Sequence, residues 1–278
     1  WMSVITSTDP DHLDIYGTKE AYLESFRHYT ELIQPGGALI IHTNLEMEAN
    51  VQEGVKTYTY SRDAGDFHAE NIIIENGEIT FDFISPVECI KGVQLGQPVP
   101  INIENGVAAM AMAQLNGCTA NELKFGMKTY HGVDRRFDFK IRNNRHVYLS
   151  DYAHHPQEIL QSAKSLKELY ANRKITAIFQ PHLYSRTHDF YKEFAEALSH
   201  FDEVILTEIY PARELPMEGV TSQLIFDNLK AGVEKSMIQK DDVLELVKNR
   251  DFDVLITLGA GDLDNYAPQI TRIIKEKE

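Results

Sequence analysis

The second half of the chain alternates short apolar runs with amphipathic segments. The apolar runs read HVYLS, KITAIF, EVILTEI and DVLITLG, and in the segments between them apolar residues recur every three or four positions. The first pattern predicts buried strands, and the second predicts helices. The helices are expected over residues 156–170, 187–198, 222–230 and 241–248, with a last one ending near residue 275. This alternation indicates a largely parallel sheet joined by right-handed crossovers, in which ligands bind beyond the carboxyl ends of the strands.

The first half shows a more mixed pattern. Asn76-Gly77 separates two strand-like runs, NIIIE and EITFDF, and such a pair is a strong hairpin signal. Thr119, followed by Glu122 three residues later, predicts a capping box at a helix start. Further strands are expected at residues 2–6 and 38–42, and helices at residues 19–33, 104–115 and 120–129. The whole chain is therefore expected to be α/β, with a domain boundary near Arg136, where the pattern changes.

Composition and charge exclude several classes of function. With 27 Lys and Arg against 42 Asp and Glu, the net charge is −15, which repels nucleic acids and anionic membranes. Cys89 and Cys118 form no CxxC pair, so the sequence indicates neither a disulfide framework nor a structural zinc site. No apolar run is long enough to span a bilayer, and no signal peptide is evident. We expect a soluble, cytoplasmic protein with no nucleic-acid or membrane partner.

Ionisable residues gather where the predicted strands of the second half end. SDYAHHP contains Asp151, His154 and His155, and it fits either a helix entry or a binding site, so both interpretations stay open. FQPHLYSRTHD brings His182 and Arg186 to the next strand end, and this concentration favours function. The remaining ends, TEIYPARE and TLGAGD, include a Gly-x-Gly turn that is interpreted as structural.

Three other polar features have ordinary interpretations when they are considered alone. STDPDHLDIYGT, which contains His12, fits a turn better than a magnesium site. Asn105 resembles a helix-start residue, and Arg136 resembles a surface charge. Ser185 is not part of a GxSxG motif, so the sequence does not indicate a serine hydrolase.

Taken in order, these segments resemble the ATP-dependent Mur ligases over essentially the whole chain. The matching motifs are PDHLDIYG, ENGVAAMAMA, GVDRRFDF, DYAHHPQEI, FQPHLYSRT, TEIYPARE and GAGD. The resemblance implies a truncated central ATP-binding domain with a mixed sheet over residues 1–136. It also implies a Rossmann-like C-terminal ligase domain over residues 137–278. FQPHLYSRT resembles the branch that adds L-alanine to UDP-N-acetylmuramate more than the branch that adds a preformed tripeptide in murein recycling.

The resemblance also implies residue roles. ATP would phosphorylate the lactyl carboxylate of UDP-N-acetylmuramate, and the amine of L-alanine would attack the acyl phosphate. His12 matches a residue that helps to hold Mg²⁺, and this replaces the turn interpretation. Asn105 matches an adenine contact, whereas Arg136 and Asp151 match nucleotide-binding residues. The substrate-binding residues would be Tyr152, His154, His182 and Arg186, of which the last three are also the catalytic candidates.

The sequence departs from the family pattern in several places. It has no Gly-rich phosphate loop, no upstream acidic magnesium ligand and no N-terminal uridine-nucleotide domain, so the chain is expected to be an inactive fragment. Ser7 replaces a common Asn, and Leu183 and His188 replace common Arg residues, which puts the mode of carboxylate recognition in question. Two alternatives stay open: a non-catalytic module that binds nucleotide or amino acid, and a metal-binding structural protein.

Overall fold

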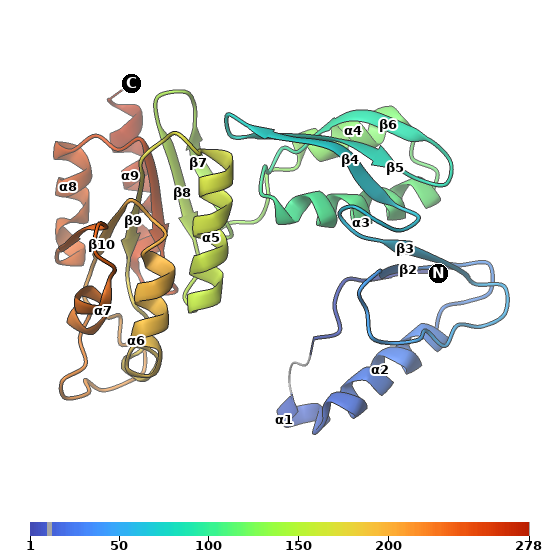
Figure 1. The fold of residues 1–278 in the computed structure, drawn as a ribbon, viewed down its shortest axis with the longest axis horizontal. Helices are drawn as coiled ribbons and strands as arrows, with labels where there is room; N and C mark the ends of the chain where they lie inside the picture. The colour runs from blue at the N-terminus through green and yellow to red at the C-terminus, as the bar shows by residue number, and fades with distance from the viewer. Residues whose placement is uncertain (10–12, 278) are drawn as a thin grey trace. The chain divides into compact units, whose positions relative to one another are not determined.

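The computed structural model describes residues 1–9 and 13–277. The chain forms two compact units, Trp1–His131 and Gly132–Glu278, each with its own sheet structure (Figure 1). The division falls shortly before Arg136, and the assignment of residues 1–136 and 137–278 to separate domains stays a prediction. Among the described residues, no helix is both long enough and apolar enough to cross a membrane.

The first unit begins with a parallel sheet. Its strands, in spatial order, are β1 (Met2–Ile5), β2 (Ala38–His42) and β3 (Lys56–Tyr60). The short α1 (Leu13–Tyr16) precedes α2 (Lys19–Glu31). Leu23 and Phe26 of α2 pack against a small core that contains Ile5 and Leu39. Thr18 caps α2, because its hydroxyl oxygen accepts a hydrogen bond from the backbone N–H of Ala21.

An antiparallel sheet and two helices complete the first unit. The strands are β4 (His68–Glu75), β5 (Glu78–Ile84) and β6 (Cys89–Gln94), and the helices are α3 (Ile101–Leu115) and α4 (Ala120–Thr129). The predicted hairpin is confirmed, with both Asn76 and Gly77 in the left-handed region. The capping box of Thr119 and Glu122 is also confirmed. Helix α3 starts three residues earlier than expected, because Pro100 already has helical backbone angles.

The second unit contains a six-stranded sheet in the order β11-β10-β9-β12-β8-β7. All neighbours are parallel except β7 and β8. The strands are β7 (Asp138–Arg142), β8 (Val147–Asp151), β9 (Ile175–Phe179), β10 (Glu203–Leu206), β11 (Glu234–Met237) and β12 (Val254–Leu258). A largely parallel sheet was expected for this half of the chain, and the structure confirms it.

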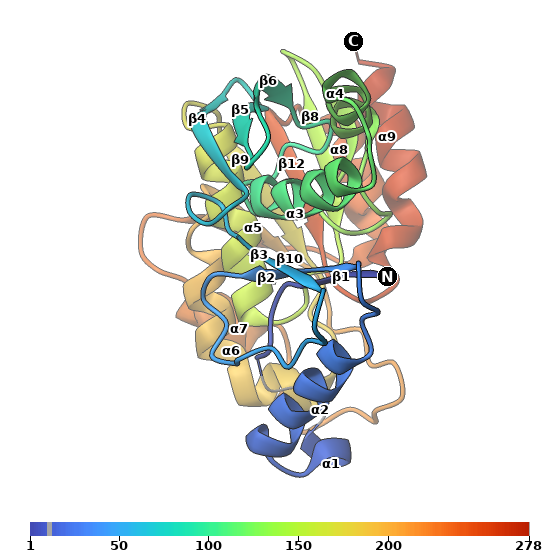
Figure 2. The same ribbon diagram turned by 90° about the vertical axis from the view of Figure 1, so that its right-hand side faces the viewer.

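Helices cover both faces of this sheet (Figures 1 and 2). One face carries α5 (Pro156–Leu169), α6 (Tyr184–Leu198) and α7 (Gln223–Asn228), and the other carries α8 (Val243–Asn249) and α9 (Ala267–Lys275). Short 3-10 turns, η1 (Lys240–Asp242) and η2 (Leu263–Tyr266), precede α8 and α9. Residues such as Val247, Leu255 and Ile270 form a buried core on the α8 and α9 side. The sheet is therefore a rigid platform for the loops at its carboxyl edge.

Three features of the second unit differ from the expectation. The edge strands β7 and β11 carry no continuous apolar run, and all of β11 is exposed, so the hydrophobic pattern did not reveal them. Helix α6 begins at Tyr184 and not at Thr187. This earlier start places Arg186 in the first turn of a helix, where a loop was expected.

Candidate active site

The segments that follow β8, β9 and β10 meet through a row of aromatic rings. The ring centroid of Tyr152 lies 4.9 Å from that of His154, which lies 6.2 Å from that of His182. The ring of His182 stacks on Tyr210 with centroids 5.8 Å apart and an interplanar angle of 21°. Three of the four predicted substrate residues thus lie together, and Tyr210 is a member of the row to which the sequence assigned no role.

Arg186, the fourth predicted substrate residue, contacts His182 directly. Its Nη1 lies 3.4 Å from Nδ1 of His182. A guanidinium group can only donate hydrogen bonds, so Nδ1 of His182 accepts and the imidazole proton is on Nε2. Burial lowers the pKa of His182, and the nearby charges of Arg186 and Arg213, with that of His154 when its ring is protonated, lower it further. The structure therefore favours a neutral His182 with an Nε2–H donor.

His154 has the opposite proton arrangement. Its Nδ1 lies 2.9 Å from the backbone carbonyl oxygen of Tyr152 and 3.4 Å from Oε2 of Glu158. Both neighbours are acceptors, so Nδ1 carries a proton and the neutral ring has a lone pair on Nε2. His155 points elsewhere, with its ring 5.2 Å from that of Phe190, and its N–H donates to Glu158 at the start of α5. His155 thus has a structural role at the helix entry.

Arg135 supports the row of rings at its other end. Its guanidinium lies 4.7 Å from the ring centroid of Tyr152, and its Nε lies 3.0 Å from Oδ2 of Asp264. The backbone N–H of Tyr152 donates to the carbonyl oxygen of Arg135, and Ser150 donates to Asp264. Arg135 has a left-handed backbone, with φ of 62°. Such strain in a non-glycine residue is often found at functional sites.

Asp151, a predicted nucleotide ligand, is held by groups of the second unit itself. Its carboxylate accepts hydrogen bonds from the backbone N–H groups of Phe137 and Ala153 and from the hydroxyl of Ser162. Burial raises its pKa, and these hydrogen bonds partly oppose that shift. Asp151 thus joins Phe137, just before β7, and Ala153, in the loop before α5, to Ser162 in the middle of α5. Arg136, the other predicted nucleotide ligand in this region, is exposed.

The two glycines of TLGAGD are required by close packing, in agreement with the structural interpretation. A Cβ atom at Gly259 would lie 2.6 Å from the carbonyl oxygen of Gln180, and one at Gly261 would lie 2.2 Å from Oε1 of Gln180. The side chain of Gln180 is buried and bonds to Asp262 and to the backbone N–H of Leu263. Only glycine leaves room for this link between the ends of β9 and β12.

The three departures from the family pattern occupy different surroundings. Leu183 is buried and has a left-handed backbone, with φ of 73°. His188 is exposed, and its Nδ1 lies 2.9 Å from Oδ1 of Asp189. In the first unit, Ser7 donates to Asp9 and accepts from its backbone N–H, as turn residues do. Arg186 is thus the arginine of this segment that contacts His182.

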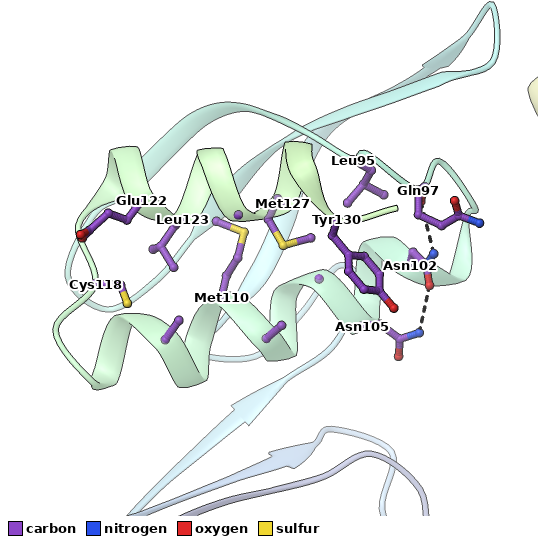
Figure 3. Close-up of a pocket in the computed structure, with 14 residues that line it drawn as sticks. Leu95, Gln97, Asn102, Asn105, Met110, Cys118, Glu122, Leu123, Met127 and Tyr130 are labelled. Carbon is purple, nitrogen blue, oxygen red and sulfur yellow. Dashed lines mark hydrogen bonds between the residues drawn. The ribbon is translucent and has the colours of Figure 1, made fainter. Parts of the chain in front are cut away.

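Asn105 lines a separate cavity of about 540 Å³ between α3 and α4 in the first unit (Figure 3). Its side-chain amide donates to Asn102, which in turn donates to the carbonyl oxygen of Gln97. Figure 3 shows these amides and the hydroxyl of Tyr130 at one end of the cavity. Much of the remaining lining is apolar: Leu95, Ala109, Met110, Ala113, Leu123 and Met127. An apolar cleft with a few amides at one end suits a flat heteroaromatic ring with polar edges.

A polar pair lies beside the start of α3 in the same unit. His42, at the end of β2, has its Nε2 3.1 Å from Oε2 of Glu104, which also accepts a hydrogen bond from the backbone N–H of Arg62. Burial and Glu104 raise the pKa of the nearby Tyr60 to about 12. The sequence did not single out this pair, because its members are separated by a whole sheet and a loop.

The predicted magnesium ligand His12 lies outside the described residues. Within residues 1–9 and 13–277, no group of three or more His, Cys, Asp or Glu side chains is arranged to hold a metal ion. The assignment of His12 therefore stays a prediction. The same finding gives no support to the alternative of a metal-binding structural protein.

Two family models match successive parts of this chain. Residues 2–113 match the Mur ligase middle domain, and residues 135–261 match the Mur ligase glutamate ligase domain. The chain therefore belongs to the Mur ligase family and contains its middle and C-terminal domains.

Among the relatives are proteins named UDP-N-acetylmuramate–L-alanine ligase. That of Phocaeicola vulgatus is 64% identical over 100% of this chain and 60% of its own length, and that of Parabacteroides distasonis is 52% identical over 99% and 59%. The solved UDP-N-acetylmuramate-alanine ligase of Thermotoga maritima has the same fold, with a TM-score of 0.73 at 23% identity. That match covers 99% of this chain and 59% of the solved one. The chain thus spans about 60% of the length of the relatives that it matches.

Proposed function

We propose that the complete protein joins L-alanine to the lactyl carboxylate of UDP-N-acetylmuramate in the synthesis of peptidoglycan precursors. ATP would activate the carboxylate as an acyl phosphate. The observation that carries the proposal is the convergence of two imidazoles and one guanidinium, those of His154, His182 and Arg186, in a Mur ligase C-terminal domain. The names of the most similar relatives support the choice of substrates.

The proton positions on the two imidazoles suit attack by an amine on an acyl group. Nε2 of His154 has a lone pair and can take a proton from the amine as its nitrogen bonds to the acyl carbon. Nε2–H of His182 and the guanidinium of Arg186 can donate to the oxygen that becomes negative. When the carbon–oxygen bond to phosphate breaks, phosphate leaves with the electron pair and the amide forms. Tyr152 would help to hold the substrate beside His154.

The nucleotide side of the proposal concerns Asn105, Arg136, Asp151 and His12. The amide of Asn105, at the polar end of its cavity, has the donor and acceptor needed for the edge of adenine. Arg136 is exposed and offers a guanidinium to phosphate, and Asp151 accepts a hydrogen bond from the backbone N–H of Phe137, the next residue. Magnesium would neutralise phosphate charge, with His12 as one of its ligands. These assignments rest on the family resemblance.

The test uses the product of the complete gene. With ATP, Mg²⁺ and UDP-N-acetylmuramate, we expect phosphate release that depends on L-alanine, and mass spectrometry should detect the alanyl product. Arg186→Ala should lower kcat/KM by about 100-fold or more, since it removes a donor to the developing charge. Arg272→Ala is the matched control, because this arginine is exposed on α9 and pairs only weakly with Glu276 at 3.8 Å.

The same assay separates the alternatives. If the preformed tripeptide, and not L-alanine, stimulates phosphate release, the protein is a murein-recycling ligase. If calorimetry detects binding of ATP or alanine while no amino acid or peptide stimulates turnover, the binding module is the better description. Equal activities of the Arg186→Ala and Arg272→Ala proteins would remove Arg186 from the proposed mechanism.

A further inference from the structure

The turn after β10 is bound closely to the segment that carries His182. The backbone N–H of Tyr210 donates to the carbonyl oxygen of Pro181 at 2.8 Å, and that of Leu183 donates to the carbonyl oxygen of Tyr210 at 3.0 Å. His182 and Tyr210 thus form a short parallel bridge beyond the sheet, and their rings stack. The position of His182 therefore depends on the turn Tyr210–Glu214.

Glu214, at the end of this turn, caps helix α6. The carboxylate accepts a hydrogen bond from the backbone N–H of Ser185 at 3.0 Å and one from its hydroxyl at 2.5 Å. Leu183, the N-cap residue of α6, has no polar side chain that could serve as a cap. Glu214 therefore supplies from 29 residues away the acceptor that a local Ser or Asp would normally provide. Its negative charge also suits the positive end of the helix dipole.

The capped turn sets the distance between His182 and Arg186. These residues lie on either side of the helix start, and their contact requires the first turn of α6 to be formed. The backbone of Leu183 is left-handed, as is that of Ala212 in the facing turn, with φ of 49°. Neither residue favours this conformation, so both need surroundings that hold them in it. The hydrogen bonds from Ser185 to Glu214 join the two strained segments.

The charges around His182 are also unbalanced without Glu214. Arg186 from α6, His154 from the loop after β8 and Arg213 from the turn all disfavour a proton on His182, whereas Glu214 favours one. The pKa of Glu214 is itself lowered by its hydrogen bonds from Ser185, so its carboxylate stays ionised at neutral pH. Tyr210 covers one face of the ring.

We propose that Glu214 is a positioning residue of the active site, which keeps His182 and Arg186 in contact by capping α6 from the neighbouring turn. The role of those two residues in catalysis rests on the proposed function, whereas the capping itself does not. Glu214 acts through Ser185 and needs no contact with substrate. This assigns a purpose to the second glutamate of the TEIYPARE segment.

Two variants separate the cap from the charge. Glu214→Gln removes the negative charge but keeps an acceptor for Ser185, whereas Glu214→Ala removes both. Glu218→Ala is the matched control, because this carboxylate is exposed in the same loop. Histidine-selective NMR of the 278-residue chain should show a lower pKa of His182 in both Glu214 variants and an unchanged pKa in Glu218→Ala.

Kinetics of the complete gene product supply the second measurement. Glu214→Ala should lower kcat/KM by at least about tenfold, since misplaced catalytic groups lose rate steeply, and Glu214→Gln should recover most of that loss. The proposal is overturned if His182 titrates alike in wild type and Glu214→Ala, or if Glu218→Ala loses as much activity as Glu214→Ala. If wild type releases no alanine-dependent phosphate, the proposed function fails, and the NMR result still decides whether Glu214 acts on His182. If Glu214→Ala does not fold, Ser185→Ala takes its place, because it removes the hydroxyl that donates to Glu214. A lower kcat/KM is then expected, and an unchanged kcat/KM overturns the proposal.

Discussion

Replacement of Asp151 by alanine should destabilise the second unit even in the absence of any ligand. The carboxylate accepts three hydrogen bonds, at 2.5 Å from Ser162, 3.3 Å from Phe137 and 3.4 Å from Ala153. These partners connect β7, β8 and α5, so their loss loosens the place where the chain enters the sheet. Asp151→Asn is the informative companion, because an amide can still accept from the backbone and donate to the hydroxyl of Ser162.

The expected magnitude follows from the geometry. A hydrogen bond to a charged group contributes about 1.5 to 3 kcal/mol, and the short bond from Ser162 is assigned to that range. The two longer backbone bonds contribute roughly 0.5 kcal/mol each. Removal of a buried carboxylate returns about 1 kcal/mol of desolvation free energy. The net loss for Asp151→Ala is thus about 2 kcal/mol, or a Tm lower by roughly 4 to 8 °C for a unit of this size.

Urea denaturation and calorimetry at pH 7 measure this loss, and we expect Asp151→Asn to lose less than about 1 kcal/mol.

The pH dependence of the free energy of unfolding provides a second check. Burial raises the pKa of Asp151, so the folded state binds its proton more tightly than the unfolded state does. The free energy of unfolding of wild type should therefore rise relative to that of Asp151→Asn as the pH falls from above the pKa of Asp151 in the folded state to below its pKa in the unfolded state. A loss under about 0.5 kcal/mol for Asp151→Ala, or equal losses for both variants, would refute this reasoning.

Three further predictions concern packing and ion pairs. Gly261→Ala should lower the free energy of unfolding by about 1 to 3 kcal/mol, because the new Cβ atom would collide with Gln180. Gly126 lies on α4 with open space beside it, so Gly126→Ala should raise the free energy of unfolding by roughly 0.5 to 1 kcal/mol. Urea denaturation measures both changes. Arg250→Ala should cost about 3 kcal/mol by the same assay, since it leaves the buried carboxylate of Glu203 with a single lysine partner. Burial opposes ionisation of Glu203, yet its hydrogen-bonded and charged partners lower its pKa overall. The ion pair of Arg250 and Glu203 should therefore stabilise the fold at pH values above the unfolded-state pKa, and this stabilisation should be lost as the pH falls through the folded-state pKa. If the free energy of unfolding has the same pH dependence in wild type and Arg250→Ala, this expectation is contradicted.

Elements with a strong local pattern were predictable from the sequence. The capping box of Thr119 and Glu122 needs only residues three apart, and the hairpin at Asn76-Gly77 needs only a turn that favours left-handed backbone. Strand β11 is the contrasting case. It is exposed at the edge of the sheet, so no burial shaped its sequence, and the hydrophobic pattern therefore did not indicate it.

Candidate site residues were predictable to the extent that the sheet itself brings them together. In a parallel sheet the carboxyl ends of the strands meet at one edge, and this places His154 near His182 without knowledge of any contact. The pairs Arg135 with Asp264 and Ser185 with Glu214 were not predicted, although all four residues lie in or next to motifs that the sequence had singled out. Each pair joins residues far apart in the chain, and the periodicity of apolar residues does not indicate such a contact.

The chemistry of the two histidines illustrates why this difference matters. The proton on His154 follows from a local contact, with a carbonyl oxygen two residues earlier in the same loop. The proton on His182 follows from a contact with Arg186, which exists because α6 starts at Tyr184 and not three residues later. That early start depends on a left-handed Leu183 and on the distant carboxylate of Glu214. The proton acceptor of the site, Nε2 of His154, thus depends on a short stretch of sequence. The hydrogen-bond donors, His182 and Arg186, depend on tertiary structure.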